Sequence, residues 1–154
     1  MAEKLLEEGM TAPDFSLEGD DGNTYSLASF KGKKLVLYFY PKDNTSGCTK
    51  EAIAFTQVKD EFGGKNAVIV GVSPDSIKSH QNFKTKHSLN FLLLSDPDRS
   101  VAAAYGAYGE KKMYGKAVMG IIRSTFVIGE NGKLEKAFRN VKVDGHAEKV
   151  MCVL

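Results

Sequence analysis

Cysteine and histidine are scarce in this chain, and neither occurs in a pattern that binds metal. The two cysteines, Cys48 and Cys152, lie far apart and form no CxxC motif and no half of a zinc site. The three histidines, His80, His87 and His146, share no spacing typical of metal ligands. A disulfide reductase with two neighbouring cysteines is therefore not indicated, and we expect neither a metal nor another cofactor.

The chain also lacks a marked excess of charge and any long apolar run. A net charge of +2 is too small to indicate binding to nucleic acid or to a membrane surface. The first residues, MAEKLLEEG, are charged and contain no apolar core of a signal peptide. No apolar run approaches the length that spans a membrane. We therefore expect a cytoplasmic protein in a reducing environment.

What the chain does contain is an alternation of predicted strands and helices along its 154 residues. With 42% apolar and 26% charged residues, we expect one globular domain, 1–154, with a substantial core. Alternating and short apolar patterns predict strands at 15–17, 24–26, 35–40, 67–72, 91–94, 124–128 and 133–138. Helical periodicity predicts helices at 49–62, 76–87, 100–105 and 145–154. This order predicts an α/β fold with a mixed central sheet flanked by helices and an N-terminal β-hairpin.

Several helix ends and loops are predicted from single residues. Ser100 and Asp144 stand at the starts of two predicted helices, where their side chains can cap free N–H groups. Ile77 and Phe83 are expected on the inward face of the second predicted helix. The glycine-rich segment 106–120 predicts a loop, which we expect to shape the rim of the functional site.

Cys48 lies where a predicted buried strand is followed by a short loop and a predicted helix. Pro41 ends the strand because it has no N–H for a sheet ladder, and the residues after it are polar. At the start of the helix, free backbone N–H groups favour the thiolate form of Cys48. Thr45 lies three residues before Cys48, and Glu51 lies three residues after it on the same side of the helix. This placement indicates a reactive cysteine rather than a small buried apolar residue.

Pro41, Thr45 and Cys48 form the motif PxxxTxxC, which resembles the active-site signature of the peroxiredoxins. The longer string FYPKDNTSGCTKEA is similar to the bacterioferritin comigratory protein branch, also called peroxiredoxin Q. A second block, GEKKMYGKAVMGIIRSTFVI at 109–128, resembles the same branch, and the likeness runs from about Gly9 to the C-terminus. The resemblance implies a thioredoxin-like fold and a thiol-dependent peroxidase.

The resemblance also implies a role for each residue of the site. Cys48 would be the peroxidatic cysteine, whose thiolate attacks a peroxide oxygen and becomes a sulfenic acid. Thr45 would hydrogen-bond the peroxide, and Pro41 would shield the site from water. Arg123 matches the family's arginine that faces the sulfur, and Glu51 matches the carboxylate that orients this arginine. The implied partners are hydrogen peroxide or an alkyl hydroperoxide and a thiol reductant, and the implied assembly is a monomer or a weak dimer.

The chain departs from many members of this branch at position 53, where Ile53 replaces a resolving cysteine. Cys152, expected as a half-buried residue on the terminal helix, is the only other cysteine. The chain is therefore either a one-cysteine enzyme that an external thiol reduces, or a two-cysteine enzyme resolved by Cys152. Thioredoxin or another thiol remains open as the reductant. A thiol-based redox sensor is the alternative, since one reactive cysteine can signal without turnover.

Overall fold

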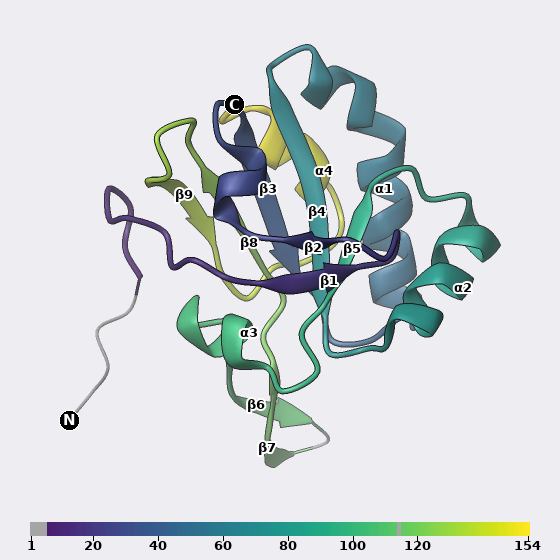
Figure 1. Cartoon of the computed structure of the whole chain (residues 1–154). Helices are drawn as coiled ribbons and strands as arrows, with labels where there is room; N and C mark the ends of the chain where they lie inside the picture. The colour runs from purple at the N-terminus through teal and green to yellow at the C-terminus, as the bar shows by residue number, and fades with distance from the viewer. Residues whose placement is uncertain (1–5, 114) are drawn as a thin grey trace.

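A mixed seven-stranded sheet forms the centre of the molecule within residues 6–113 and 115–154, which the computed structural model describes (Figure 1). Its strands follow the order β2-β1-β5-β4-β3-β8-β9. Their bounds are β1 Leu17–Gly19, β2 Thr24–Tyr25, β3 Lys34–Phe39, β4 Ala67–Ser73, β5 Leu92–Ser95, β8 Ser124–Ile128 and β9 Leu134–Phe138. The three central strands β3, β4 and β5 are parallel, whereas β1, β8 and β9 pair antiparallel. The predicted mixed sheet is therefore confirmed.

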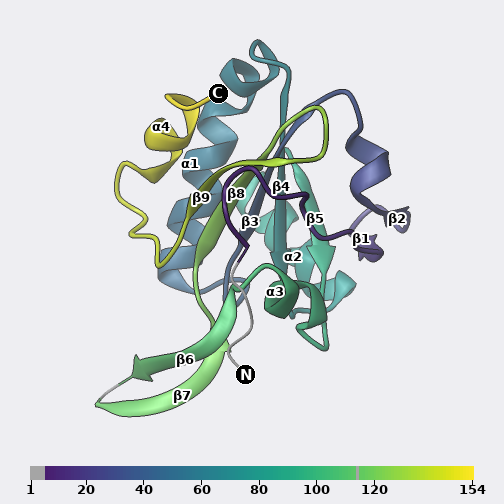
Figure 2. The same cartoon turned by 90° about the vertical axis from the view of Figure 1, so that its left-hand side faces the viewer.

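Helices cover both faces of this sheet. They are α1 Ser46–Gly63, α2 Ile77–His87, α3 Ser100–Ala104, α4 His146–Met151 and the 3-10 helix η1 Leu27–Phe30. Residues of α1, α2 and α4 share one apolar core with the sheet, whereas those of α3 and η1 belong to the core on the other face. Figure 2 shows α4 lying beside α1. Among the described residues, no helix is both long enough and apolar enough to cross a membrane.

The central strand β3 explains why both cores are apolar. Successive side chains of a strand point to opposite faces of the sheet. Leu35, Leu37 and Phe39 enter one core, and Val36 and Tyr38 enter the other. All five are buried, which accounts for the continuous apolar run in the sequence. The strand thus gives a rigid platform to the loop that follows it.

Both predicted hairpins of the central sheet are present, with bounds shifted by one or two residues. β1 pairs with β2 near the N-terminus, and β8 pairs with β9 across the turn at 129–132. The helix predicted from position 49 begins at Ser46, inside the stretch that looked like a loop. The shift arises because polar residues are as common in the first turn of a helix as in the loop before it.

The prediction of a loop at 106–120 is wrong. β6 Tyr108–Met113 and β7 Lys116–Ile121 form a two-stranded antiparallel ribbon. The ribbon projects from the body of the molecule, and most of β7 is exposed (Figure 2). A strand that is solvated on both faces shows no alternation of apolar and polar residues, so only the glycines gave a signal.

Ser100 does not cap α3, contrary to its prediction. It is the first helical residue, and the preceding Arg99 has a φ of 62°. Carboxylates that precede Arg99 accept hydrogen bonds from the free N–H groups of the helix. Oδ1 of Asp98 accepts one from the N–H of Ser100 at 3.1 Å. Asp96 accepts from the next two N–H groups, at 3.3 and 2.9 Å. The tight turn at Arg99 brings these carboxylates close to the helix end, and sequence spacing did not reveal that turn.

Asp144 does not cap α4 either. The residue at the cap position is Gly145, with a φ of 71°, which glycine adopts without strain. The Asp144 carboxylate instead forms an ion pair with the ammonium group of Lys50 on α1. Both side chains are largely exposed, so this pair adds little stability. It does place the start of α4 beside the first turns of α1.

Candidate active site

Cys48 is the third residue of α1, and the cap residue of that helix is Thr45. The first intrahelical bond runs from the N–H of Thr49 to the carbonyl of Thr45, at 2.8 Å. The three N–H groups before it, including that of Cys48, have no partner within the helix. Cys48 is only 1% exposed, and its thiol is free. The structure thus confirms its predicted position at a helix start and adds that the sulfur is buried.

Arg123 contacts the sulfur from the neighbouring strand. β8 pairs antiparallel with β3 so that Ser124 lies opposite Phe39, and this register brings Arg123 to the end of β3 where the Cys48 loop begins. Nη2 of Arg123 lies 3.2 Å from Cys48 Sγ. A Cβ atom at Gly47 would lie 3.2 Å from the same Nη2, so glycine at that position leaves room for the guanidinium.

Glu51 holds the other arm of the guanidinium. Nη1 of Arg123 donates a 2.6 Å hydrogen bond to Glu51 Oε1, and the Glu51 side chain is only 2% exposed. Burial raises the pKa of Glu51 to about 7, although Arg123 acts in the opposite direction. Burial also disfavours the charge of Arg123, but Glu51 and the Cys48 sulfur outweigh it and raise the pKa of Arg123. The arginine therefore stays a cation and faces the sulfur in a fixed orientation.

Thr45 and Pro41 lie in the segment that joins β3 to the Cys48 helix. Thr45 is exposed, and its hydroxyl donates a 2.8 Å hydrogen bond to the carbonyl of Lys42. The lone pairs of this hydroxyl remain open, so Thr45 can accept a hydrogen bond from an incoming O–H group. Pro41 is half-buried and lines a cavity of about 830 Å³ together with Arg123. The ribbon of β6 and β7 contributes Glu110, Lys111 and Ile121 to the same cavity.

Cys152 lies apart from this arrangement. It follows α4 directly and is exposed, so its prediction as a half-buried residue is wrong. The apolar face of α4 is formed by Ala147 and Val150, which are buried. The ring of His146, at the start of α4, lies 6.0 Å from that of Phe55 in the middle of α1. From there α4 extends toward the C-terminal end of α1, away from the Cys48 end (Figure 2).

A buried polar network behind the Cys48 loop was not predicted. Of the two residues expected inward on α2, Phe83 is fully buried but Ile77 only half-buried, and His80 is the second fully buried residue. Nδ1 of His80 lies 2.7 Å from Asp43 Oδ2. Asp75 joins them, with ligand-type atoms of all three within 4.8 Å of one another, and hydrogen bonds engage these atoms. The only sequence signal was that His80 lies three residues before Phe83 on the same helical face.

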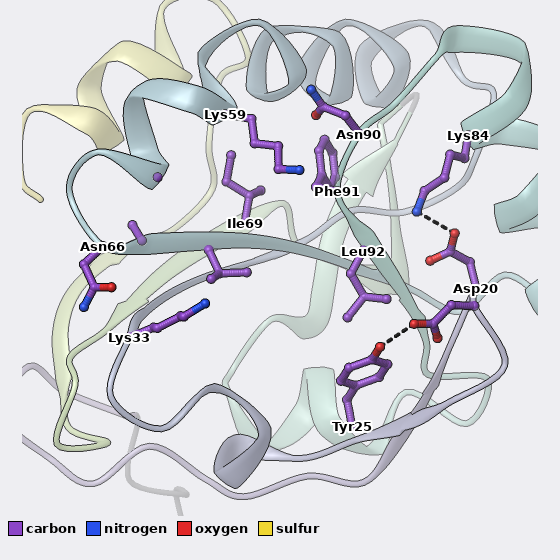
Figure 3. A pocket seen from close by; sticks show the side chains of 14 residues that line it. Asp20, Tyr25, Lys33, Lys59, Asn66, Ile69, Lys84, Asn90, Phe91 and Leu92 are labelled. Atoms are coloured by element: carbon purple, nitrogen blue, oxygen red, sulfur yellow. Dashed lines mark hydrogen bonds and ion pairs between the residues drawn. The ribbon is translucent and has the colours of Figure 1, made fainter.

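A second hollow, of about 490 Å³, lies at the opposite end of the parallel strands (Figure 3). It is lined by residues at the start of β4 and the end of α1, and its floor includes Ile69 and Leu92. Lys84 is paired there with Asp20 at 2.6 Å. The hollow contains no thiol, whereas Cys48 stands at the carboxyl end of β3, where α/β sheets carry their sites. We therefore place the candidate active site at Cys48.

Comparisons with known proteins give one consistent result. The AhpC/TSA family matches residues 9–137. A peroxiredoxin bcp of Helicobacter pylori strain J99 is 57% identical over 146 residues, 95% of this chain and 96% of that protein. Peroxiredoxin Bcp of Bacillus subtilis is 49% identical over 149 residues, with coverage of 97% and 95%. The solved bacterioferritin comigratory protein of Xanthomonas campestris, described for its alkyl peroxide reduction activity, has a TM-score of 0.88 at 42% identity, covering 95% of this chain and 96% of that one.

Proposed function

The chain belongs to the AhpC/TSA family of peroxiredoxins, and we propose that Cys48 is the residue through which it reduces peroxides. Its sheet and helices form the thioredoxin-like fold of that family, as the sequence predicted. It is accordingly a thiol-dependent peroxidase. The observation that carries the assignment of Cys48 is the 3.2 Å contact between its sulfur and the Arg123 guanidinium.

The proposed first step is attack of the Cys48 thiolate on one oxygen of the peroxide. An S–O bond forms and the O–O bond breaks, so the attacked oxygen stays on the sulfur as a sulfenic acid. The leaving oxygen takes a proton from solvent and departs as water or an alcohol. Arg123 stabilises negative charge as it moves from the sulfur to the leaving oxygen. Thr45 accepts a hydrogen bond from the peroxide, since its own proton is directed to the Lys42 carbonyl. Pro41 covers the site on the side of the cavity.

The substrates are peroxides, and we propose that they include alkyl hydroperoxides as well as hydrogen peroxide. The cavity of about 830 Å³ beside Arg123 is far larger than hydrogen peroxide needs. Its lining includes Ile121, Ile122 and Val141, which suit an apolar substituent. The related Xanthomonas campestris protein is described for alkyl peroxide reduction, which supports the same class here.

The reductant is a thiol, and we propose that it comes from outside the chain. Ile53 occupies the position of a resolving cysteine, and Cys152 follows a helix that extends away from Cys48. A disulfide between them needs Cα atoms within about 7 Å, which would require unwinding of α1 or fraying of the C-terminus. An external thiol fits a cytoplasmic setting, where thiols are kept reduced.

Replacing Cys152 with serine tests this proposal. We expect Cys152→Ser to keep the turnover of the unmodified chain, within about twofold, with dithiothreitol and with thioredoxin. Peptide mapping of the oxidised unmodified chain should contain no crosslink between Cys48 and Cys152. Loss of thioredoxin-dependent turnover together with loss of such a crosslink would establish Cys152 as the resolving residue instead.

The peroxidase assignment itself is tested by turnover. Peroxide consumption is followed with thioredoxin, glutaredoxin and dithiothreitol in parallel, using hydrogen peroxide and a bulky alkyl hydroperoxide. We expect many peroxides to be consumed per chain whenever an effective thiol is present. A chain that consumes one equivalent and then stops with all three thiols would be a redox sensor, and slow reaction of Cys48 with both peroxides would exclude either role.

A further inference from the structure

The loop between β3 and α1 is tied down by one buried carboxylate. Asp43 lies two residues before Thr45, and its side chain is almost fully buried. The hydroxyl of Tyr40 donates to Asp43 Oδ1 at 2.6 Å, and the hydroxyl of Ser79 donates to Oδ2 at 2.8 Å. His80 Nδ1 lies 2.7 Å from the same Oδ2. Two of these partners, Ser79 and His80, come from α2, so α2 holds the loop that presents Thr45 and Cys48.

Both ring nitrogens of His80 have a polar partner. Its Nε2 lies 2.8 Å from the carbonyl oxygen of Leu94 on β5, and a carbonyl oxygen can only accept. Its Nδ1 faces Asp43 Oδ2, which already accepts from Ser79. The His80 side chain is fully buried, so its contact with Asp43 is shielded from water. Removing one partner of a buried hydrogen bond leaves the other polar group without compensation, which makes the contact strongly orienting.

Because Cys48 is buried, the contact between Asp43 and His80 should affect oxidation by peroxide and reduction by a thiol differently. This consequence depends on the proposed role of Cys48. A peroxide of few atoms needs little room, and the cavity of about 830 Å³ beside Arg123 can admit it. A thiol must bring its own sulfur into contact with the Cys48 sulfenic acid, and a sulfur that is 1% exposed offers no such contact. The loop and the first turn of α1 must therefore open for reduction.

We propose that His80 is a positioning residue that latches the Cys48 loop in its closed state. When the latch holds, Thr45 and Cys48 stand in place for the peroxide. When it is released, the loop opens and an external thiol reaches the sulfenic acid. In that step the thiol sulfur bonds to Cys48 Sγ, the S–O bond breaks and water leaves; a second thiol then releases Cys48. Weakening the latch should thus slow the peroxide step and accelerate the thiol step.

Two substitutions separate the two contacts of His80. A glutamine amide reaches about as far as Nε2, so His80→Gln retains a donor for Leu94 and loses the one for Asp43. An asparagine amide stops at about the position of Nδ1, so His80→Asn retains a donor for Asp43. For His80→Gln we expect the rate constant with hydrogen peroxide to fall roughly tenfold or more, as misplaced groups do in active sites. We expect reduction of the sulfenic acid by dithiothreitol to accelerate roughly tenfold, because one charge-assisted hydrogen bond no longer opposes opening.

His80→Asn should return both rate constants most of the way to those of the unmodified chain. The matched control is His87→Gln on the same helix, because His87 packs on Phe83 and has no contact with Asp43. This control should change neither rate constant. Hydrogen exchange gives an independent measure: amides of the first turn of α1 should lose protection in His80→Gln and keep it in His87→Gln. A variant that merely unfolds in part would slow the peroxide step without raising the rate of reduction.

The proposal would be overturned if the rate constants for reaction with peroxide and for reduction by dithiothreitol both fell in His80→Gln. It would also be overturned if neither changed while the chain stayed folded. It would also be overturned if His80→Asn behaved like His80→Gln, since the contact with Asp43 would then be irrelevant. Failure of the proposed function looks different, because the unmodified chain itself would react slowly with peroxide. The hydrogen-exchange comparison remains informative in that case, since it does not depend on the reaction of Cys48.

Discussion

The Cys48→Ser variant should lose thiol-dependent peroxide turnover completely while its sheet and helices remain folded. Serine is close to cysteine in size, and the Arg123 guanidinium that lies 3.2 Å from the sulfur can donate to a hydroxyl instead. The change in the free energy of unfolding should therefore stay within about 1.5 kcal/mol. A serine hydroxyl does not ionise usefully near neutral pH, so the nucleophile is lost. The measurement is peroxide consumption with dithiothreitol in excess.

Cys152→Ser is the natural control for this experiment, because it removes the chain's other thiol and leaves Cys48 in place. The two variants should lie at opposite extremes, with no turnover in one and full turnover in the other. Substantial thiol-dependent turnover in Cys48→Ser, with its circular dichroism unchanged, would remove Cys48 from the peroxidatic role.

Replacing Arg123 with methionine should slow the reaction with peroxide by roughly a hundredfold to a thousandfold, as the loss of one oriented donor does in other active sites. Its effect on the amount of thiolate cannot account for this. A thiol whose pKa falls from about 8.5 to about 6 gains roughly thirtyfold in thiolate at pH 7. The weaker nucleophile loses roughly thirteenfold at a Brønsted slope of about 0.45, so the net gain is only about twofold. Most of the arginine's effect must therefore arise in the transition state.

The fold should tolerate the Arg123→Met substitution. Burial raises the pKa of Glu51 to about 7, and Arg123 is the residue that opposes this rise. Without the arginine, Glu51 can take up a proton near neutral pH instead of remaining a bare buried charge. Thermal unfolding at pH 6 and pH 8 checks this: the variant should lose more stability at pH 8, where the carboxyl would otherwise be charged.

The decisive measurement for Arg123 compares two reagents. The second-order rate constant of Cys48 is measured with hydrogen peroxide and with iodoacetamide, a neutral alkylating agent that also needs the thiolate. The loss should be far larger with peroxide. Lys111→Met is the matched control, because it removes another cation from the lining of the same cavity while the Arg123 contact remains. Equal losses with both reagents in Arg123→Met would argue against a role specific to peroxide.

The local features of the site were predictable from the sequence alone. A buried strand, the proline that ends it and a helix that starts a few residues later are all determined by neighbouring residues. They predict Cys48 at the start of a helix, as the structure has it, whereas the cap residue Thr45 was not predicted. The motif PxxxTxxC then indicated the chemistry, because the resemblance it carries is equally local.

The features that were missed depend on how distant segments pack. The ribbon of β6 and β7 exposes most of its second strand, so no apolar alternation marked it. The caps of α3 and α4 depend on the turns at Arg99 and Gly145, which bring other groups to the helix ends or direct a side chain elsewhere. Both capping errors arose where the backbone conformation of one residue, rather than residue type, decides which hydrogen bond forms.

Tertiary structure alone decided how Cys48 and Arg123 meet. Arg123 reaches Cys48 because β8 pairs with β3 in one register, and a shift of one residue would turn its side chain to the other face. Nothing in the sequence indicated that Asp43 and His80 would meet, and they lie in contact only because α2 is hydrogen-bonded to the Cys48 loop. Residue order along the chain determines which groups are available, whereas the distances and the burial that govern their reactivity arise from contacts between segments far apart in that order.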